Sequence, residues 1–231
     1  MVQALFNQVN IQTETLPKIG IIGSGIVGQV LAKAFVSEGH DVKLGTRNIA
    51  KEEAVLFKEA NPVIMLGTFD ETAQFGELLV LATGGSVTEE AITLAGIANF
   101  SGKVIIDATN PIAAAPPENG VLKFFTDLNE SLMEKIQQFI PEGRVVKAFN
   151  SVGNAFMYKP DFAGGPPTMF ITGNDEDAKK TVTTILTSFG WETEDMGKAE
   201  AARAIEPLCI LWCIPGLINN KWTHAFKLLK A

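Results

Sequence analysis

The sequence predicts an α/β protein of the Rossmann type, in which a doubly wound, mainly parallel sheet is followed by a small C-terminal helical part. From Lys18 onward, short runs rich in β-branched residues alternate with amphipathic segments of helical length, a pattern typical of βαβ units. A glycine-rich stretch, 23–28, stands directly between the first such strand and the first helix. With 231 residues, 46% of them hydrophobic, the chain is long enough to bury one substantial core.

The alternation continues through the first half of the chain. It predicts strands over Lys18–Ile22, Asp41–Leu44, Val63–Gly67, Leu78–Ala82 and Val104–Asp107, and helices over Ile26–Ser37, Ala50–Glu59, Thr88–Ala98 and Ser131–Phe139. Parallel strands bring their carboxyl ends to one edge of the sheet, which is where doubly wound folds bind ligands. The residues that follow each strand are therefore the first candidates for a site.

The second half continues in the same way. Strands are predicted over Arg144–Phe149 and Thr168–Thr172, with a helix over Asp175–Phe189 that Asn174 or Asp175 caps and Gly190 stops. After the segment Trp191–Met196, a helical stretch is predicted over Ala199–Leu229 that is kinked or split at Pro215 and Gly216. We expect an N-terminal extension over residues 1–17, a Rossmann domain over 18–198 and a helical segment over 199–231.

Composition excludes several classes of function. The formal net charge of −7 provides no basic stripe to neutralise phosphates, so neither a nucleic acid nor an anionic membrane is expected as a partner. The longest apolar run, 208–218, contains Pro215 and Gly216 and is shorter than the ~20 residues that span a bilayer. Cys209 and Cys213 fit two small buried side chains better than a redox pair or a metal site, and no metal site is expected. We expect a cytoplasmic protein.

The stretch Gly23, Ser24, Gly25, Ile26, Val27, Gly28 has the G-x-G-x-x-G spacing of a dinucleotide-binding turn. Gly23 is expected to make the tight turn, Gly25 to let the pyrophosphate approach the backbone, and Gly28 to let the helix pack closely on the sheet. The anion would lie at the helix N-terminus. The apolar face of that helix is predicted to comprise Ile26, Val27, Val30, Leu31, Ala34 and Phe35.

The end of the second predicted strand selects between NAD and NADP. An NAD site usually has an acidic residue there for the ribose 2′-hydroxyl, whereas this chain has Thr46, Arg47 and Asn48. Arg47 offers a permanently charged donor fork for a 2′-phosphate, and Lys51, four residues on, adds a second charge. We therefore predict that the site binds NADP(H). The alternative is that Arg47 is a solvent-exposed residue that only caps a turn and contacts no ligand.

The nicotinamide half is expected after the fourth, fifth and sixth strands. Ala82, Thr83 and Gly84 are small enough to let a ribose lie against the backbone. Asn110 is a candidate for hydrogen bonds to the ribose or carboxamide, and Pro111 restricts it to an extended conformation, although the pair can also be a simple turn. Asn150 takes the corresponding place after the sixth strand.

No acid or base for proton transfer stands out. The chain has two histidines, His40 and His224, and its single tyrosine, Tyr158, lacks the spacing to lysine of a Ser-Tyr-Lys arrangement. We therefore expect no catalytic residue, since hydride can pass directly between two ring systems when the second substrate is a flavin-like carrier.

Several strings together resemble a known family. They are Gly23–Gly28, Gly45–Asn48, Asp107–Pro111, Val145–Asn150, Glu206–Leu208, Leu211–Trp212 and Ala225–Leu229. They look like the NADPH-dependent reductases related to deazaflavin (coenzyme F-420):NADP oxidoreductase and like the cytosolic domain of the six-transmembrane metalloreductases. The resemblance spans about residues 18 to 229. It implies NADP(H) binding, a Rossmann core, a small C-terminal helical part and a dimer.

Three functions stay open. The first is hydride transfer between NADP(H) and a flavin or deazaflavin. The second is reduction of a small carbonyl or imine, for which Lys147, Asn150 or Asn154 would serve as donor, although Lys147 lies in a buried strand pattern and is better explained as pairing with an acid or reaching an edge. The third is a non-enzymatic NADPH sensor. The apolar C-terminal helices predict a homodimer interface or packing onto the core.

Overall fold

The computed structural model describes residues 16–231, so nearly all of the predicted extension over 1–17 lies outside the described residues. Eight strands form one sheet in the order β3-β2-β1-β4-β5-β6-β7-β8. Neighbouring strands are parallel except β6 and β7, which are antiparallel, and this confirms the doubly wound, mainly parallel sheet. The strands are β1 (Ile19–Ile22), β2 (Val42–Gly45), β3 (Met65–Gly67), β4 (Leu78–Leu81), β5 (Val104–Asp107), β6 (Arg144–Lys147), β7 (Thr168–Gly173) and β8 (Glu192–Asp195).

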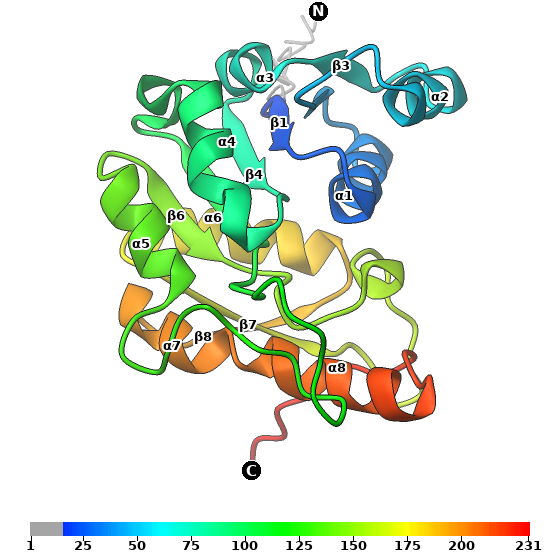
Figure 1. Ribbon diagram of the computed structural model, residues 1–231, viewed down its shortest axis with the longest axis vertical. Helices are drawn as coiled ribbons and strands as arrows, with labels where there is room; N and C mark the ends of the chain where they lie inside the picture. The colour runs from blue at the N-terminus through cyan, green and yellow to red at the C-terminus, as the bar shows by residue number, and fades with distance from the viewer. Residues whose placement is uncertain (1–15) are drawn as a thin grey trace, which may run out of the picture.

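Helices cover both faces of the sheet and enclose two apolar clusters (Figure 1). The cluster on one face includes Leu31 and Phe35 of α1 and Leu186 of α6, whereas the other includes Ile92 of α4 and Ile136 of α5. The helices are α1 (Ile26–Ser37), α2 (Glu52–Ala60), α3 (Phe69–Phe75), α4 (Thr88–Ala95), α5 (Leu132–Phe139), α6 (Glu176–Ser188), α7 (Ala202–Ile205) and α8 (Leu208–Asn219), with 3-10 turns η1 (Gly85–Val87), η2 (Ile97–Phe100), η3 (Asn154–Phe156) and η4 (Ala199–Ala201).

Helix α3 is an element that the sequence analysis did not predict. It begins with a capping box, in which the Thr68 hydroxyl accepts from the Glu71 amide at 3.2 Å and the Glu71 carboxylate accepts from the Thr68 amide at 2.8 Å. The two bonds satisfy amides that a helix start otherwise leaves free. At seven residues, the helix is too short for hydrophobic periodicity to reveal it.

Capping also explains where the predicted helices begin and end. Asp175 caps α6, because its carboxylate accepts from the Ala178 amide at 2.7 Å, and Gly190 follows that helix with a left-handed φ of 89°. The helix predicted to reach residue 98 ends instead at Ala95, since Gly96 adopts a φ of 79° and a 3-10 turn follows.

The prediction for the C-terminal helix is wrong in two respects. The helical stretch is divided at Pro207 rather than at Pro215, and it ends at Asn219 rather than near residue 229. Pro215 stands near the end of α8, where its missing amide removes one bond of the last turns. Asn220 then adopts a left-handed φ of 52° and donates to the Gly216 carbonyl at 2.9 Å. The chain beyond it is not helical and runs back along β7 and β8, where Thr168 donates to the Phe226 carbonyl at 2.9 Å.

The helical stretch 199–219 extends well beyond the apolar run 208–218 that the sequence analysis found too short to cross a membrane. Its length and composition suffice to cross one, with a mean hydropathy of 1.5 over its apolar window, and a third of that window is buried within the fold. Helices that pack in the core of a soluble protein share this composition. Here Ala202, Ile205, Cys209 and Trp212 are buried against the rest of the chain.

An ion pair joins α5 to α7. The Arg203 guanidinium Nε lies 3.0 and 3.1 Å from the two Glu134 carboxylate oxygens, and Glu134 also completes the capping box of Ser131. The hydrogen bond from Arg203 lowers the pKa of Glu134 from its ordinary 4.5 to about 2. A carboxylate whose pKa is lowered by folding stabilises the folded state above its ordinary pKa, and this contribution is lost as the pH falls through the folded value.

We therefore predict that Arg203→Gln lowers the free energy of unfolding modestly at pH 7, because Arg203 is partly exposed and solvent screens the pair. The difference from the native chain should shrink as the pH falls from 4.5 toward 2, which urea unfolding at several pH values measures. Lys180→Gln, which breaks an exposed pair with Asp177, is the matched control. A difference that stays constant over this pH range would contradict the assignment.

Candidate dinucleotide site

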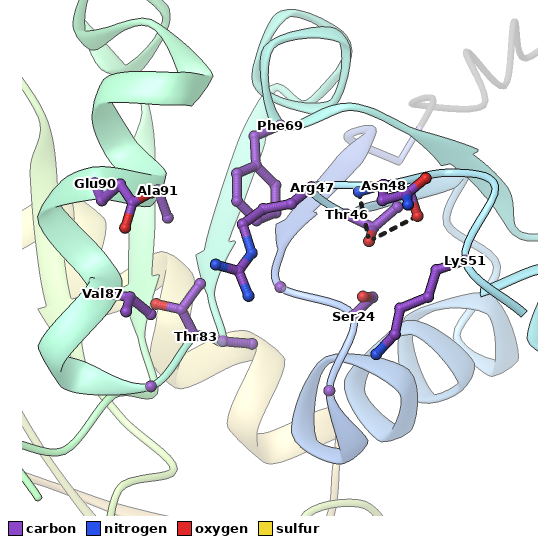
Figure 2. Close-up of a pocket in the computed structure, with 14 residues that line it drawn as sticks. Ser24, Thr46, Arg47, Asn48, Lys51, Phe69, Thr83, Val87, Glu90 and Ala91 are labelled. Atoms are coloured by element: carbon purple, nitrogen blue, oxygen red, sulfur yellow. Dashed lines mark hydrogen bonds between the residues drawn. The ribbon is translucent and has the colours of Figure 1, made fainter. Parts of the chain in front are cut away.

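A cavity of about 570 Å³ opens where the sheet order changes between β1 and β4 (Figure 2). Its volume lies in the range of small-molecule sites, and its position is the switch point at which doubly wound sheets bind ligands. Its lining comprises Gly23, Ser24, Gly25, Thr46, Arg47, Asn48, Lys51, Phe69, Ala82, Thr83, Gly84, Val87, Glu90 and Ala91. Ten of the sixteen predicted site residues are thus brought together here.

The three glycines of the turn have different surroundings, and these match the predicted roles. Gly23 adopts a φ of 122°, and a Cβ there would lie 2.5 Å from the Ala82 carbonyl oxygen. A Cβ on Gly28 would lie 1.9 Å from the Gly23 carbonyl oxygen, so only glycine lets α1 start so close to the turn. A Cβ on Gly25 would meet nothing within 4 Å and would project into open space.

The start of α1 is suited to an anion. Its N-cap residue, Gly25, provides no side-chain bond to the first amides of the helix. These amides carry the partial positive charge of the helix N-terminus, which favours a phosphate. The open space above Gly25 and the uncapped helix start together fit the pyrophosphate of a dinucleotide.

We predict that Gly25→Val strongly weakens dinucleotide binding while the fold is retained. Gly25 has an extended backbone, with a φ of −70° and a ψ of 179°, that any residue adopts, so the valine side chain only fills the space for the pyrophosphate. Titration of NADPH fluorescence should show at least a hundredfold weaker binding, an estimate that corresponds to about 2.7 kcal/mol. Gly28→Ala, by contrast, should lower thermal stability, because its Cβ meets backbone. Unchanged NADPH affinity of a folded Gly25→Val protein would contradict the assignment.

Two cations flank the glycine turn. Figure 2 shows Arg47 and Lys51 both extending toward the glycine turn, with Ser24 between them. Arg47 is exposed and makes no hydrogen bond or ion pair with any residue from 16 to 231, whereas Lys51 contacts Glu53 at 3.4 Å. Thr46 is buried, and its hydroxyl lies 3.4 Å from the Asn48 amide. A pair of cations at this place fits the 2′-phosphate of NADP.

The remaining predicted residues do not line the cavity. Val27 is half-buried against the core and Gly28 is buried, so their role would be through the backbone of the turn. Ile26 was expected on the buried face of α1, and this is wrong, since 60% of it is exposed. It is the first residue of the helix and stands at the open end of the turn, where the core does not reach.

Asn110, Pro111 and Asn150 form a second group at the carboxyl ends of β5 and β6. The Asn110 amide donates to the Asn150 carbonyl at 2.8 Å, and the Asn150 amide donates to the Ile205 carbonyl at 2.9 Å. A Cβ on Gly85 would lie 2.1 Å from the Asn110 carbonyl oxygen, so this group adjoins the loop that follows Gly84 in the cavity. The predicted contacts with the nicotinamide half stay a prediction.

The backbone before Asn150 is strained. Phe149 adopts a left-handed φ of 63°, which is uncommon for a bulky residue and is often found at ligand sites. Its ring is fully packed in the core, and its amide faces the Met169 sulfur at 3.1 Å. The packing therefore holds the turn that places Asn150 at the strand end.

Four lining residues were missed by the sequence analysis: Phe69, Val87, Glu90 and Ala91. Phe69 is the first residue of α3, and the capping box of Thr68 and Glu71 is a sequence signal that could have placed it after β3. The other three lie at the start of the helix after β4, the position from which a doubly wound fold presents residues to its ligand.

Lys147 is paired with acids, as the sequence analysis favoured. Its ammonium is fully buried and lies 2.7 Å from Asp107 Oδ2, 2.9 Å from Glu206 Oε1 and 2.9 Å from the Thr109 carbonyl oxygen. Burial alone would lower the pKa of Lys147, but Asp107 and Glu206 outweigh it and raise that pKa above its ordinary value. The three contacts saturate the three donors of the ammonium.

Other reactive side chains of the described chain lie elsewhere. The Tyr158 hydroxyl donates to Glu38 at 2.8 Å, beyond the far end of α1 from the glycine turn. Cys209 and Cys213 are free, the former buried and the latter half-buried. Among residues 16–231 there is no cluster of three His, Cys, Asp or Glu side chains that could hold a metal ion.

The fold and the cavity define a Rossmann protein that binds a nicotinamide dinucleotide. The family model described as NADP oxidoreductase, coenzyme F-420-dependent, matches residues 18–111. A putative F-420-dependent NADP-reductase from Arthrobacter sp. FB24 is 31% identical, and its structure superposes with a TM-score of 0.86 over 93% of this chain and 100% of that one. The chain belongs to this family and is an NADP-dependent oxidoreductase.

Two further relatives extend the comparison. Metalloreductase STEAP3 of Rattus norvegicus is 31% identical over 208 residues, which are 87% of this chain. The chain spans 39% of the length of that metalloreductase. An imine reductase from Aspergillus terreus shares the fold, with a TM-score of 0.62 and 18% identity over 89% of this chain and 64% of that one.

Proposed function

We propose that this protein transfers hydride between NADP(H) and a second carrier that is a flavin or a deazaflavin. The observation that supports this acceptor is the chemistry at the ends of β4, β5 and β6. The residues that follow these strands, 82–85, 108–112 and 148–152, include no ionisable side chain. Since a flavin-like ring delocalises the electron pair that it receives, hydride transfer to it requires orientation rather than a protein acid.

The residues of the cavity would bind and orient the cofactor. The backbone of the glycine turn and the start of α1 hold the pyrophosphate, and Arg47 with Lys51 holds the 2′-phosphate. The small residues Ala82, Thr83 and Gly84 lead from the cavity toward Asn110 and Asn150. When bound, NADPH supplies the hydride from its nicotinamide ring, and the opposite transfer regenerates it.

The relatives support the same class of acceptor. The name of the Arthrobacter protein specifies F-420, a deazaflavin, and STEAP3 is named as a metalloreductase. Both names describe the passage of reducing equivalents to a carrier or metal rather than reduction of a metabolite. This chain matches the full length of the Arthrobacter protein and 39% of the length of STEAP3.

Reduction of a small carbonyl or imine is the second candidate, and it needs a proton donor. Lys147 was one candidate for that role, but its ammonium is fully buried and saturated by Asp107, Glu206 and the Thr109 carbonyl. The Asn150 amide is committed to the Ile205 carbonyl. The likeness to imine reductases at 18% identity is one of fold.

The test is an acceptor panel with the purified full chain. NADPH is mixed with FMN, FAD, riboflavin, a deazaflavin, and a set of aldehydes and cyclic imines, and the loss of reduced-nicotinamide absorbance is followed. We expect turnover with a flavin or deazaflavin, and Gly25→Val protein is the matched control for cofactor-independent reaction. Turnover with imines alone would establish the second candidate. Tight NADPH binding with no turnover on any acceptor would instead establish a non-enzymatic sensor.

A homodimer is our proposal for the assembly. Leu211, Leu217 and Ile218 of α8 are 54%, 39% and 57% exposed, which is a large apolar surface for one helix. A second copy of the chain would bury it. Sedimentation should show a dimer for the native chain and a monomer for Leu211→Glu with Ile218→Glu; a native monomer would overturn this proposal. A cytoplasmic location stays a prediction.

A further inference from the structure

The cavity has a second wall that the phosphates do not explain. Val87, Glu90 and Ala91, from the beginning of α4 and the turn before it, face the cavity together with Phe69 of α3 (Figure 2). Three of these four side chains are apolar and one is a carboxylate. In Figure 2 they lie across the cavity from Ser24 and Lys51, with Arg47 between the two sides.

This wall is where the adenine base belongs. The inference rests on NADP(H) occupying the cavity, with its pyrophosphate at the glycine turn and its 2′-phosphate near Arg47 and Lys51. The base is attached to the same ribose as the 2′-phosphate, so it must occupy the part of the cavity next to that phosphate. Phe69, Val87 and Ala91 offer the apolar surface against which a flat aromatic ring packs.

Glu90 is anomalous in such a place. A carboxylate that lines a site for a ligand with several negative charges weakens binding of that ligand, unless the ligand donates a hydrogen bond to it. Glu90 makes no hydrogen bond or ion pair within residues 16–231, so no neighbour in that range neutralises it. Adenine has one donor on its ring edge, the exocyclic amino group, since its ring nitrogens there are acceptors.

We propose that Glu90 reads the adenine base by accepting a hydrogen bond from its exocyclic amino group. Glu90 is then a specificity-determining residue of the cofactor site. A base that lacks the amino group offers the carboxylate no hydrogen at this edge. The site should therefore discriminate between NADPH and its 6-deamino (purine) analogue, which lacks the amino group and carries no new donor.

Equilibrium binding of the two dinucleotides to the full chain tests the proposal. We expect the native protein to bind NADPH about tenfold more tightly than the purine analogue, a value at the lower end for a hydrogen bond to an exposed charged group. In Glu90→Gln the preference should fall to about twofold or less, because a neutral amide oxygen accepts a weaker hydrogen bond than a carboxylate and the amide NH2 can instead donate to N1, which both bases carry. Glu89→Gln is the matched control, since it removes the same charge from the same first turn of α4 without lining the cavity.

Each outcome has one meaning. A native preference that Glu90→Gln removes and Glu89→Gln keeps supports the proposal. An unchanged ratio in Glu90→Gln overturns it, including the case in which both dinucleotides gain affinity equally, because Glu90 then acts only through its charge. Equal binding of both dinucleotides to the native protein also overturns it and leaves NADP(H) binding intact. Failure of both to bind would show that the cofactor assignment itself is wrong. Circular dichroism of each variant confirms that it is folded.

Discussion

Replacement of Arg47 by alanine is expected to weaken NADPH binding about thirty- to a hundredfold and to leave NADH binding nearly unchanged. A charge-assisted hydrogen bond contributes about 1.5–3 kcal/mol, and an arginine can make two to one phosphate. Arg47 is exposed, lines the cavity and has no partner among the residues that the structure describes, so its guanidinium is available to the ligand. NADH lacks the 2′-phosphate, so its affinity should change little when Arg47 is removed.

Titration of the nicotinamide fluorescence of both cofactors measures this difference. Lys51→Ala should give a smaller loss of the same kind, since Lys51 is a point charge that already contacts Glu53. Arg144→Ala is the matched control. Arg144 is the first residue of β6 and lies where the parallel strands begin, whereas the cavity lies where they end. Equal losses for NADPH and NADH in Arg47→Ala would mean that Arg47 supports the turn rather than the 2′-phosphate.

The fold was predictable from the sequence where short patterns agree with the final packing. The strand, the glycine turn and α1 follow one another within 20 residues, and each is encoded by local chemistry: a buried β-branched run, the steric demands of Gly23 and Gly28, and the apolar face of α1. The preference for NADP was equally predictable, because it depends on adjacent residues at the end of β2, where Arg47 stands and no acid is present. These features place the phosphate half of the site.

The rest depends on contacts between distant segments. Glu90 and Phe69 come from two helices that the sheet order brings against the turn, and their periodicity alone says nothing about a cavity. The C-terminal helix ends at Asn219 because a left-handed Asn220 turns the chain back, whereas apolar residues such as Leu228 and Leu229 continue a helical pattern in the sequence. The path of the returning chain depends on its tertiary contacts, which local helix propensity does not encode.

Lys147→Met is expected to cost about 3–5 kcal/mol of unfolding free energy, the largest stability effect among the substitutions considered. Removal of the ammonium leaves the carboxylates of Asp107 and Glu206 buried without their cation, and breaking one partner of a buried pair has an effect of this size. Because the pKa of Lys147 is raised on folding, the stabilisation is complete at neutral pH. It is lost as the pH rises above 10.5 through the still higher folded value.

Urea unfolding at neutral pH measures the loss, and a variant that neutralises the whole group separates charge from packing. Lys147→Met combined with Asp107→Asn and Glu206→Gln should regain part of the lost stability, since no unpaired charge remains buried. A loss below about 1 kcal/mol in the single variant would show that water or a rearranged partner compensates the acids.

The Glu206 carboxylate also accepts hydrogen bonds from the first two backbone amides of α5, from Leu132 at 3.0 Å and from Met133 at 2.9 Å. One buried lysine thus ties the ends of β5 and β6 to both α5 and the C-terminal helices, so its loss should loosen the loop of Asn110 as well as the fold.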